Sequence, residues 1–154
     1  MATAAPSSPM FETVVVATDG SRSVSRAVDC GLDLAARFDA TVHALYVVDE
    51  RRIEELPERL HEDVTVALDE QGREALATVA AANERLEAPR DLETSVRVGR
   101  PAQEIVAHVR EVDADCVTMG TRGRSGEHSF LLGSVAERVV RTCPAPVLTV
   151  RQLE

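Results

Sequence analysis

The chain alternates short runs of β-branched apolar residues with longer segments whose apolar residues recur every three or four positions. Runs of the first kind are too short for ordinary helices and are typical of strands buried on both faces of a sheet. The segments between them are typical of amphipathic helices, so the expected order is β-α-β-α-β-α-β-α-β. The expected strands cover residues 13–17, 41–48, 94–98, 115–119 and 146–151.

This alternation constrains the fold more than any other feature of the sequence. Strands that alternate with helices through short connections require right-handed crossovers and a parallel sheet. We therefore expect a single doubly wound α/β domain of the Rossmann-like kind, with a five-stranded parallel sheet and helices on both faces. A chain of 154 residues has room for one such core and not for two. We assign it to residues 11–152 and expect residues 1–10 to form a flexible N-terminal extension.

Three local signals are placed within the expected helices. Ser21 or Ser23 is expected to cap the first helix with its hydroxyl. The second helix is long, ends near Leu86 and contains Gly72, which costs about 1 kcal/mol relative to alanine in mid-helix. Because Gly72 shares a stripe with apolar residues, we expect it to let this helix lie close to a neighbour. Pro101 is expected in the first turn of the third helix.

The charge of the chain excludes some partners. Its 17 basic residues, all arginine, and 26 acidic residues give a net charge of −9, which repels nucleic acid and anionic membrane surfaces. The absence of lysine and the acidic surface indicate a GC-rich or salt-adapted, halophilic source. No apolar stretch approaches the length of a membrane span. The scattered Cys30, Cys116 and Cys143 are expected to be free thiols, which favours a reducing, cytoplasmic location.

The expected topology indicates where a ligand binds. In doubly wound sheets, ligands bind beyond the carboxyl ends of the strands, where the strand order reverses. The loops at 18–21 and 120–133 follow the first and fourth strands. The second is rich in glycine, which permits positive φ angles and close approach of the backbone, and it leads to a helix N-terminus. Ser134 adds a hydroxyl, and Arg122 and Arg124 add positive charge, so the loop is suited to phosphates; the alternative is a flexible connection with turn glycines.

Asp19 has two interpretations. At the carboxyl end of a buried strand its carboxylate can accept hydrogen bonds from ribose hydroxyls or bind Mg²⁺, or it can cap the helix that follows. A Walker A loop is excluded because the chain has no lysine, and the first turn lacks the dinucleotide-binding G-x-G-x-x-G pattern. His43, His61 and His108 have no visible partner for nucleophilic or metal chemistry, and His128 is most simply a solvated residue of the glycine-rich loop.

Four separated motifs together resemble the universal stress protein family over about residues 11–151. The first is the Val-Ala-Thr-Asp19-Gly-Ser sequence after the first strand, and the second is Tyr-Val47-Val-Asp after the next strand. The third is the spacing Gly120-x2-Gly123-x9-Gly133-Ser134, and the fourth is the closing Cys143-Pro-Ala-Pro-Val-Leu.

The resemblance implies the ATP-binding branch of this family, with a fold like that of adenine nucleotide alpha hydrolases and with ATP or ADP, together with Mg²⁺, as ligand. It implies that Asp19 contacts the ribose or the metal-bound phosphates, that Val47 meets adenine, and that the glycines and Ser134 hold ribose and phosphates. The expected nucleotide-binding residues are Ala17, Thr18, Asp19, Val47, Val98, Met119, Gly120, Arg122, Gly123, Arg124, Gly133, Ser134 and Val135.

The resemblance also implies a homodimer formed by antiparallel pairing of the last strand, Val147 to Val150. An exposed apolar edge strand risks uncontrolled association unless it is paired in a symmetric dimer. The alternative for Val147 to Val150 is an ordinary core strand. The expected function is a nucleotide-dependent stress-response or signalling module that has no dedicated catalytic residues and hydrolyses ATP slowly at most. The alternatives are a nucleotide-free dimeric interaction protein of the same fold and, less favoured, an enzyme that attacks the α-phosphate of ATP.

Overall fold

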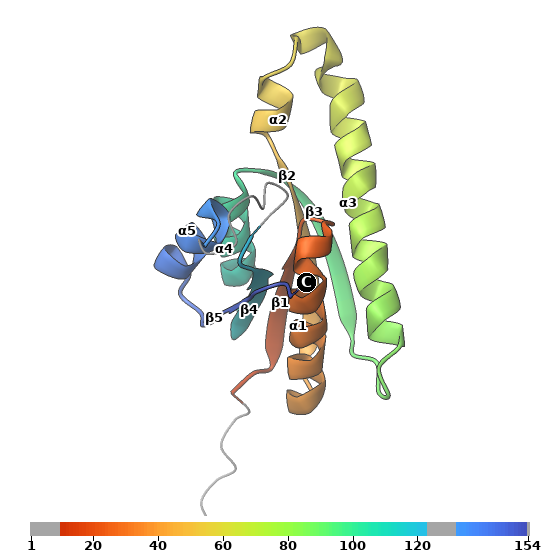
Figure 1. Ribbon diagram of the computed structural model, residues 1–154, viewed down its shortest axis with the longest axis vertical. Coiled ribbons are helices and arrows are strands. Elements are labelled where there is room, and N and C mark those ends of the chain that lie inside the picture. Colours follow the sequence, from red (N-terminus) through yellow and green to blue (C-terminus); the bar gives the residue numbers. More distant parts are fainter. Residues whose placement is uncertain (1–9, 123–131, 154) are drawn as a thin grey trace, which may run out of the picture.

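The computed structural model describes residues 10–122 and 132–153. In this part of the chain, five strands form one parallel sheet with the order β3-β2-β1-β4-β5 (Figure 1). The predicted doubly wound fold is therefore confirmed; the expected extension at 1–10 lies almost wholly outside the described residues. The strands are β1 (Thr13–Thr18), β2 (Thr41–Asp49), β3 (Leu92–Gly99), β4 (Cys116–Gly120) and β5 (Val147–Val150).

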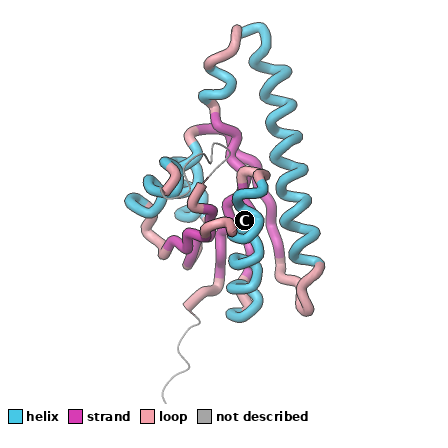
Figure 2. Tube along the Cα trace, in the orientation of Figure 1, coloured by secondary structure: helices cyan, strands magenta, loops and turns pink. Residues whose placement is uncertain are grey.

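The helices form two layers, one on each face of the sheet (Figures 1 and 2). α1 (Ser25–Phe38) and α3 (His61–Glu84) cover one face, and α4 (Pro101–Glu111) and α5 (Ser134–Thr142) cover the other. With 24 residues, α3 is about 36 Å long and extends past the carboxyl end of β2, where the short α2 (Arg51–Glu54) lies beside it. The 3-10 turns η1 (Arg22–Val24) and η2 (Glu58–Leu60) precede α1 and α3.

Each face of the central strand β1 contributes to a separate apolar core. Val14 and Val16 belong to the cluster beneath α1 and α3, whereas Val15 and Ala17 belong to the cluster beneath α4 and α5. Successive side chains of a strand point to opposite faces, so a strand covered on both sides needs an unbroken apolar run. This requirement explains why the first strand could be recognised in the sequence.

The N-terminus of α1 differs from the prediction. The helix begins at Ser25 after η1, and no side chain caps either element at its first residue, so the expected cap by Ser21 or Ser23 is wrong. The acceptor comes instead from the C-terminal end of the chain, where Gln152 Oε1 accepts hydrogen bonds from the Arg26 amide at 3.1 Å and the Ser25 hydroxyl at 3.2 Å. A contact across 126 residues leaves no local signal in the sequence.

Gly72 brings α3 close to the sheet, as predicted. A Cβ atom at this position would lie 2.6 Å from Cδ1 of the buried Tyr46 ring on β2. Gly31 plays the same part in α1, where a Cβ atom would lie 2.4 Å from the Thr118 hydroxyl. Both glycines therefore set the distance between a helix and the sheet.

We predict that Gly72→Ala destabilises the protein although alanine favours helix formation. Overpacking costs about 1–3 kcal/mol, and the gain in helix propensity returns about 1 kcal/mol, so the free energy of unfolding should fall by up to about 2 kcal/mol. Urea denaturation measures this change. Gln71→Ala, on the exposed side of the same helix turn, is the matched control and should stay within about 0.5 kcal/mol of the parent. A Gly72→Ala protein more stable than the parent would contradict the prediction.

A cluster of charged groups joins α4 to β2 and β3. Arg97 donates to Glu104 and Glu111, each at 2.7 Å, and its Nη1 atom lies 3.4 Å from His108 Nδ1. A guanidinium can only donate, so Nδ1 accepts and the proton of a neutral His108 is on Nε2. That Nε2 atom is buried without a partner among the described residues. The His43 and His108 rings are 5.9 Å apart, and His43 Nδ1 lies 3.3 Å from Glu93.

We predict that this cluster makes stability depend on pH. Burial, followed by the positive charges of Arg97 and His43, lowers the pKa of His108, whereas Glu111 and Glu93 act weakly in the opposite direction. The unfolded chain therefore takes up this proton near its ordinary pKa of about 6.5, before the folded chain does. Stability from a neutral His108 is complete above that pH and is lost as the pH falls toward the lower pKa of the folded state.

The measurement compares urea denaturation at pH 7.5 and pH 5.5 for the parent and for His108→Gln, which cannot be protonated. The parent should lose more stability than the variant over this interval, by about 1.4 kcal/mol for each unit of the pKa shift that is crossed. Other titrating groups are common to both proteins and cancel in the comparison. An equal loss in the two proteins would contradict the role assigned to His108.

Candidate functional site

The strand order reverses between β1 and β4. The chain passes outward from β1 to β2 and β3, and then crosses back to β4, which pairs with the other side of β1 through Val16 and Thr118. The carboxyl ends of β1 and β4 are thus adjacent. At Gly120, a Cβ atom would lie 3.3 Å from the Ser23 carbonyl oxygen, so the loop after β4 lies against the segment that follows β1. The two loops expected to form a site therefore meet.

The turn after β1 is organised by Asp19. One of its carboxylate oxygens, Oδ1, accepts hydrogen bonds from the Ser21 amide at 2.9 Å and the Ser21 hydroxyl at 2.6 Å. The Gly20 amide donates to the Thr18 hydroxyl at 3.1 Å, and Gly20 has a φ of 78°, which glycine adopts without strain. Asp19 thus holds the turn that leads into η1, which is close to the capping alternative raised from the sequence.

The two ends of the glycine-rich loop lie together. The Gly133 amide donates to the Thr121 carbonyl at 2.6 Å, and the Thr121 amide donates to the Val150 carbonyl at 3.2 Å. The loop therefore starts and finishes beside the end of β5. Arg122 is half-buried at its start. The predicted site residues Gly123 and Arg124, and also His128, lie outside the described residues.

The N-terminus of α5 opens at this edge of the sheet. Gly133 precedes it with a φ of −62° and a ψ of 156°, an extended conformation that any residue adopts, so the positive φ expected of the loop glycines is not found here. Among the residues that the structure describes, no side chain caps this helix, and Ser134 in its first turn is exposed. The first amides of a helix have no acceptor within the helix and carry a partial positive charge, which makes them suitable for an anion.

Four of the predicted contact residues share one face of the sheet. Ala17 and Met119 are buried in the cluster beneath α4 and α5, and Val47 and Val135 pack against that cluster. Val98 is separate from them: it is in register with Val48 and lies on the side covered by α1 and α3, where it is 49% exposed. Thr18, in register with Tyr46, is also on that side. The structure thus unites the apolar residues near α5 and places the Val98 side chain apart from them.

Charged pairs border the carboxyl ends of β2 and β3. Arg51 donates to both oxygens of Asp49, at distances down to 2.6 Å, and this hydrogen bonding lowers the pKa of Asp49. Arg100 forms ion pairs with Glu50 at 2.9 Å and Glu54 at 3.4 Å. Sequence reasoning did not single out Arg100, whose only signal is its place before Pro101. At this end of the sheet the arginine and carboxylate charges therefore largely neutralise one another.

Two kinds of feature are absent from the described part of the chain. No three histidine, cysteine, aspartate or glutamate side chains there are close enough together to hold a metal ion. A metal at Asp19 would therefore need further ligands from a bound molecule. Of the helices described, none combines the length and the apolar character required to cross a membrane. Cys30, Cys116 and Cys143 form no disulfide with one another, as predicted.

Comparisons with known proteins identify the same family that the sequence motifs resemble. The sequence profile of the universal stress protein family matches residues 10–151. The universal stress protein MJ0531 of Methanocaldococcus jannaschii is 39% identical over 144 residues, which cover 93% of this chain and 84% of that protein. YxiE of Bacillus subtilis, also a universal stress protein, is 31% identical over 152 residues and is matched along 92% of this chain and 100% of its own length.

Solved structures resemble this chain over almost its whole length. The hypothetical protein MJ0577 superposes with a TM-score of 0.83 and 26% identity, over 94% of this chain and 99% of that one. A universal stress protein solved in complex with cAMP has a TM-score of 0.66 and 31% identity, over 92% of this chain and 97% of its own.

Proposed function

Because this chain belongs to the universal stress protein family, we propose that it binds an adenine nucleotide, ATP or ADP, where β1 and β4 end. The observation that carries the proposal is the N-terminus of α5, which no side chain of the described residues caps and which lies at the point of strand-order reversal. The 31% identical relative solved with cAMP supports an adenine nucleotide as the ligand class.

The helices that start near this crevice are not equivalent. α1 also begins at this edge, but Gln152 already accepts hydrogen bonds from its Arg26 amide and Ser25 hydroxyl. α5 has no such cap among the described residues, so we assign the phosphates to its amides, to Ser134 and to Arg122. Gly123 and Arg124 remain expected contacts from the sequence. In a protein with a net charge of −9, a local source of positive potential is needed to hold a polyanion. The helix end and the arginines supply it.

We assign the contacts to adenine, ribose and Mg²⁺ from the positions of the predicted residues in the sheet. Val47, Ala17 and Met119 offer an apolar surface on the same face as α5, and we assign the adenine ring to the Val47 end of it. Asp19 is placed toward the ribose and the metal-bound phosphates. Mg²⁺ bound to a nucleotide takes most of its ligands from phosphate and water, so one carboxylate is sufficient. Asp19 directly follows β1, which ends at Thr18, so its carboxylate lies at the carboxyl end of that strand, where it could supply this ligand.

We further propose that the bound nucleotide serves a stress-response or signalling role and not rapid turnover. Fast phosphoryl transfer requires a positioned water molecule or base in addition to positive charge at the γ-phosphate. The residues assigned to this site supply positive charge and hydrogen-bond donors, and Asp19 Oδ1 is engaged in its own turn. Hydrolysis of ATP is therefore expected to be slow.

We predict that Ser134→Asp separates binding from folding. A carboxylate in the first turn of α5 interacts favourably with the helix dipole, by about 0.3–1 kcal/mol, so the fold should be retained or slightly stabilised. The same carboxylate repels the phosphates, and the affinity for MgATP should fall at least about tenfold, a change of about 1.4 kcal/mol. Isothermal titration calorimetry measures the affinity, and circular dichroism follows the thermal unfolding.

Ser134→Asn is the matched control, since it has nearly the same size as aspartate and carries no charge. It should bind MgATP more tightly than Ser134→Asp. Acid extraction of the purified parent, followed by chromatography for adenine nucleotides, adds an independent test. A parent that neither yields nor binds nucleotide would instead support a nucleotide-free interaction protein of the same fold. Equal affinities of Ser134→Asp and Ser134→Asn would sink the assignment of phosphates to α5.

We propose that the protein forms a homodimer through β5. This strand is one of the two outer strands of the sheet, and Leu148 on it and Val140 on α5 are 39% and 49% exposed. β4 donates to the carbonyls of Pro146 and Val150, so Val147 and Thr149 turn their backbone groups to the open side. Antiparallel pairing of Val147 to Val150 with a second copy would satisfy these groups and cover the apolar edge.

We predict that Thr149→Pro disrupts this dimer without disrupting the domain. Proline removes the outward amide of residue 149, which β4 does not use, and proline is tolerated on outer strands. Sedimentation velocity at micromolar concentrations should show that this pairing is lost. Thr149→Val keeps the amide and serves as the control. A Thr149→Pro protein that associates as the Thr149→Val protein does would exclude the β5 interface.

A further inference from the structure

The opposite edge of the sheet is formed by β3, which is eight residues long where β5 has four. The Val42 amide donates to the Asp91 carbonyl at 2.9 Å, and the Glu50 amide donates to the Gly99 carbonyl at 3.0 Å. In a parallel ladder, alternate residues face the neighbouring strand, so the odd-numbered residues of β3 face β2. Leu92, Thr94, Val96 and Val98 therefore present their N–H and C=O groups to the open side.

β3 carries the charged residues Glu93 and Arg97 but lacks other features that prevent association at an open edge. Its register with β2 is continuous from Leu92 to Gly99, so no bulge twists the strand away, and the segment contains no proline or lysine. In the described part of the chain, no backbone hydrogen bond reaches the outward groups of this strand. Natural proteins rarely leave a long, regular edge unprotected unless another chain pairs with it.

The sequence of β3 is complementary to itself about Ser95. If two copies pair antiparallel with Ser95 opposite Ser95, Thr94 lies opposite the partner's Val96 and Glu93 lies opposite the partner's Arg97. Thr94 and Val96 both turn their backbone groups outward, so they form the hydrogen-bonded pairs. Glu93 and Arg97 then fall at positions where side chains approach most closely. Arg97 keeps its ion pairs with Glu104 and Glu111 of its own chain, so the partner's Glu93 would join an existing cluster. The Glu93 side chain is 71% exposed and within reach of a partner.

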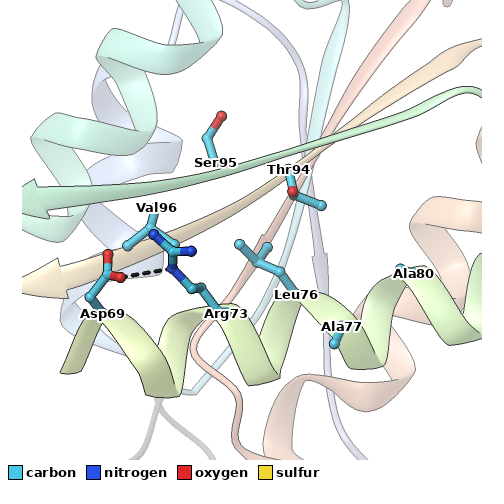
Figure 3. A pocket seen from close by; sticks show the side chains of 8 residues that line it. All are labelled: Asp69, Arg73, Leu76, Ala77, Ala80, Thr94, Ser95 and Val96. Atoms are coloured by element: carbon cyan, nitrogen blue, oxygen red, sulfur yellow. Dashed lines mark hydrogen bonds and ion pairs between the residues drawn. The ribbon is translucent and has the colours of Figure 1, made fainter. Parts of the chain in front are cut away.

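A groove beside this edge offers room for an added strand (Figure 3). It lies between α3 and β3 and has a volume of about 490 Å³. On the helix side it is lined by Leu76, Ala77 and Ala80 and by the ion pair of Asp69 with Arg73. Thr94 and Val96 line it from β3, whereas the Ser95 side chain points away from α3. Side chains of a paired strand that face α3 would enter this groove.

We propose that β3 is a second self-association edge, at which another copy of this chain pairs antiparallel about Ser95. The interface is isologous, since each strand meets the same strand of its partner. It does not depend on the proposed nucleotide site. If the β5 interface also forms, two different edges of the sheet are paired, and the protein associates beyond a dimer into rows of continuous sheet.

A cysteine at the two-fold axis tests this register directly. Ser95→Cys should give a disulfide-linked dimer on non-reducing electrophoresis when treated with diamide, which takes two hydrogens from two thiols as the disulfide forms. Glu93→Cys is the control, because residue 93 and its copy would be four residues apart along the strands, or about 13 Å. It should give no more linked dimer than the parent, whose Cys30, Cys116 and Cys143 set the background.

A second measurement follows the non-covalent association. Thr94→Pro removes an outward amide and leaves the β2–β3 hydrogen bonds in place, whereas Thr94→Val keeps the amide. In the Thr149→Pro background, where β5 pairing is removed, sedimentation velocity should show an association that Thr94→Pro abolishes and Thr94→Val retains. Linkage of Ser95→Cys no greater than that of Glu93→Cys, or a Thr149→Pro protein that is already monomeric, would overturn the proposal. Neither result bears on nucleotide binding, which Ser134→Asp tests separately.

Discussion

Burial of the parallel sheet on both faces is the constraint on which the rest of this structure depends. Val14, Val15 and Val16 at its centre have no exposed surface, and their backbone groups are used on both sides by β2 and β4. Because β1 comes first in the chain and lies in the middle of the sheet, later strands must be added on one side of it and then on the other. The strand order must therefore reverse beside β1, and the loops at the carboxyl ends of β1 and β4 are left facing each other. The position of the candidate site is thus a consequence of burying β1 at the centre of the sheet.

The two helices that begin near the candidate site differ in a contact from a distant part of the chain. α1 and α5 both begin near it, but Gln152, which follows β5, accepts hydrogen bonds from the Ser25 hydroxyl and the Arg26 amide at the start of α1. The end of α5 has no corresponding side chain in the described chain, which leaves its partial positive charge available. The same return of the chain places the Thr121 amide on the Val150 carbonyl. The last strand therefore helps to shape the loop that we assign to phosphate binding.

The edges of the sheet, unlike its centre, have backbone groups that no neighbouring strand uses. An open parallel sheet always leaves two outer strands with unpaired backbone groups, and here these are β5 and β3. β5 is short and exposes apolar side chains, whereas β3 is long and carries opposite charges at equal distances from Ser95. A net charge of −9 opposes association in general, so pairing is favoured only where local complementarity offsets it. The proposed ligand site at the centre and the proposed self-association at the edges would use separate parts of the sheet.

The sequence by itself determined the elements whose signals are local. Apolar runs located all five strands and amphipathic periodicity located the four long helices, and the position of Gly72 in an apolar stripe predicted its close approach to a neighbour. Only the tertiary structure decided which residues meet: that Gln152 replaces Ser21 and Ser23 at α1, that His108 faces Arg97, that Val98 lies on the face opposite Val47. Periodicity reports whether a residue is buried, because burial repeats with the geometry of its own helix or strand. It carries no information about the partner, which is supplied by elements distant in the chain and fixed by strand order, register and packing.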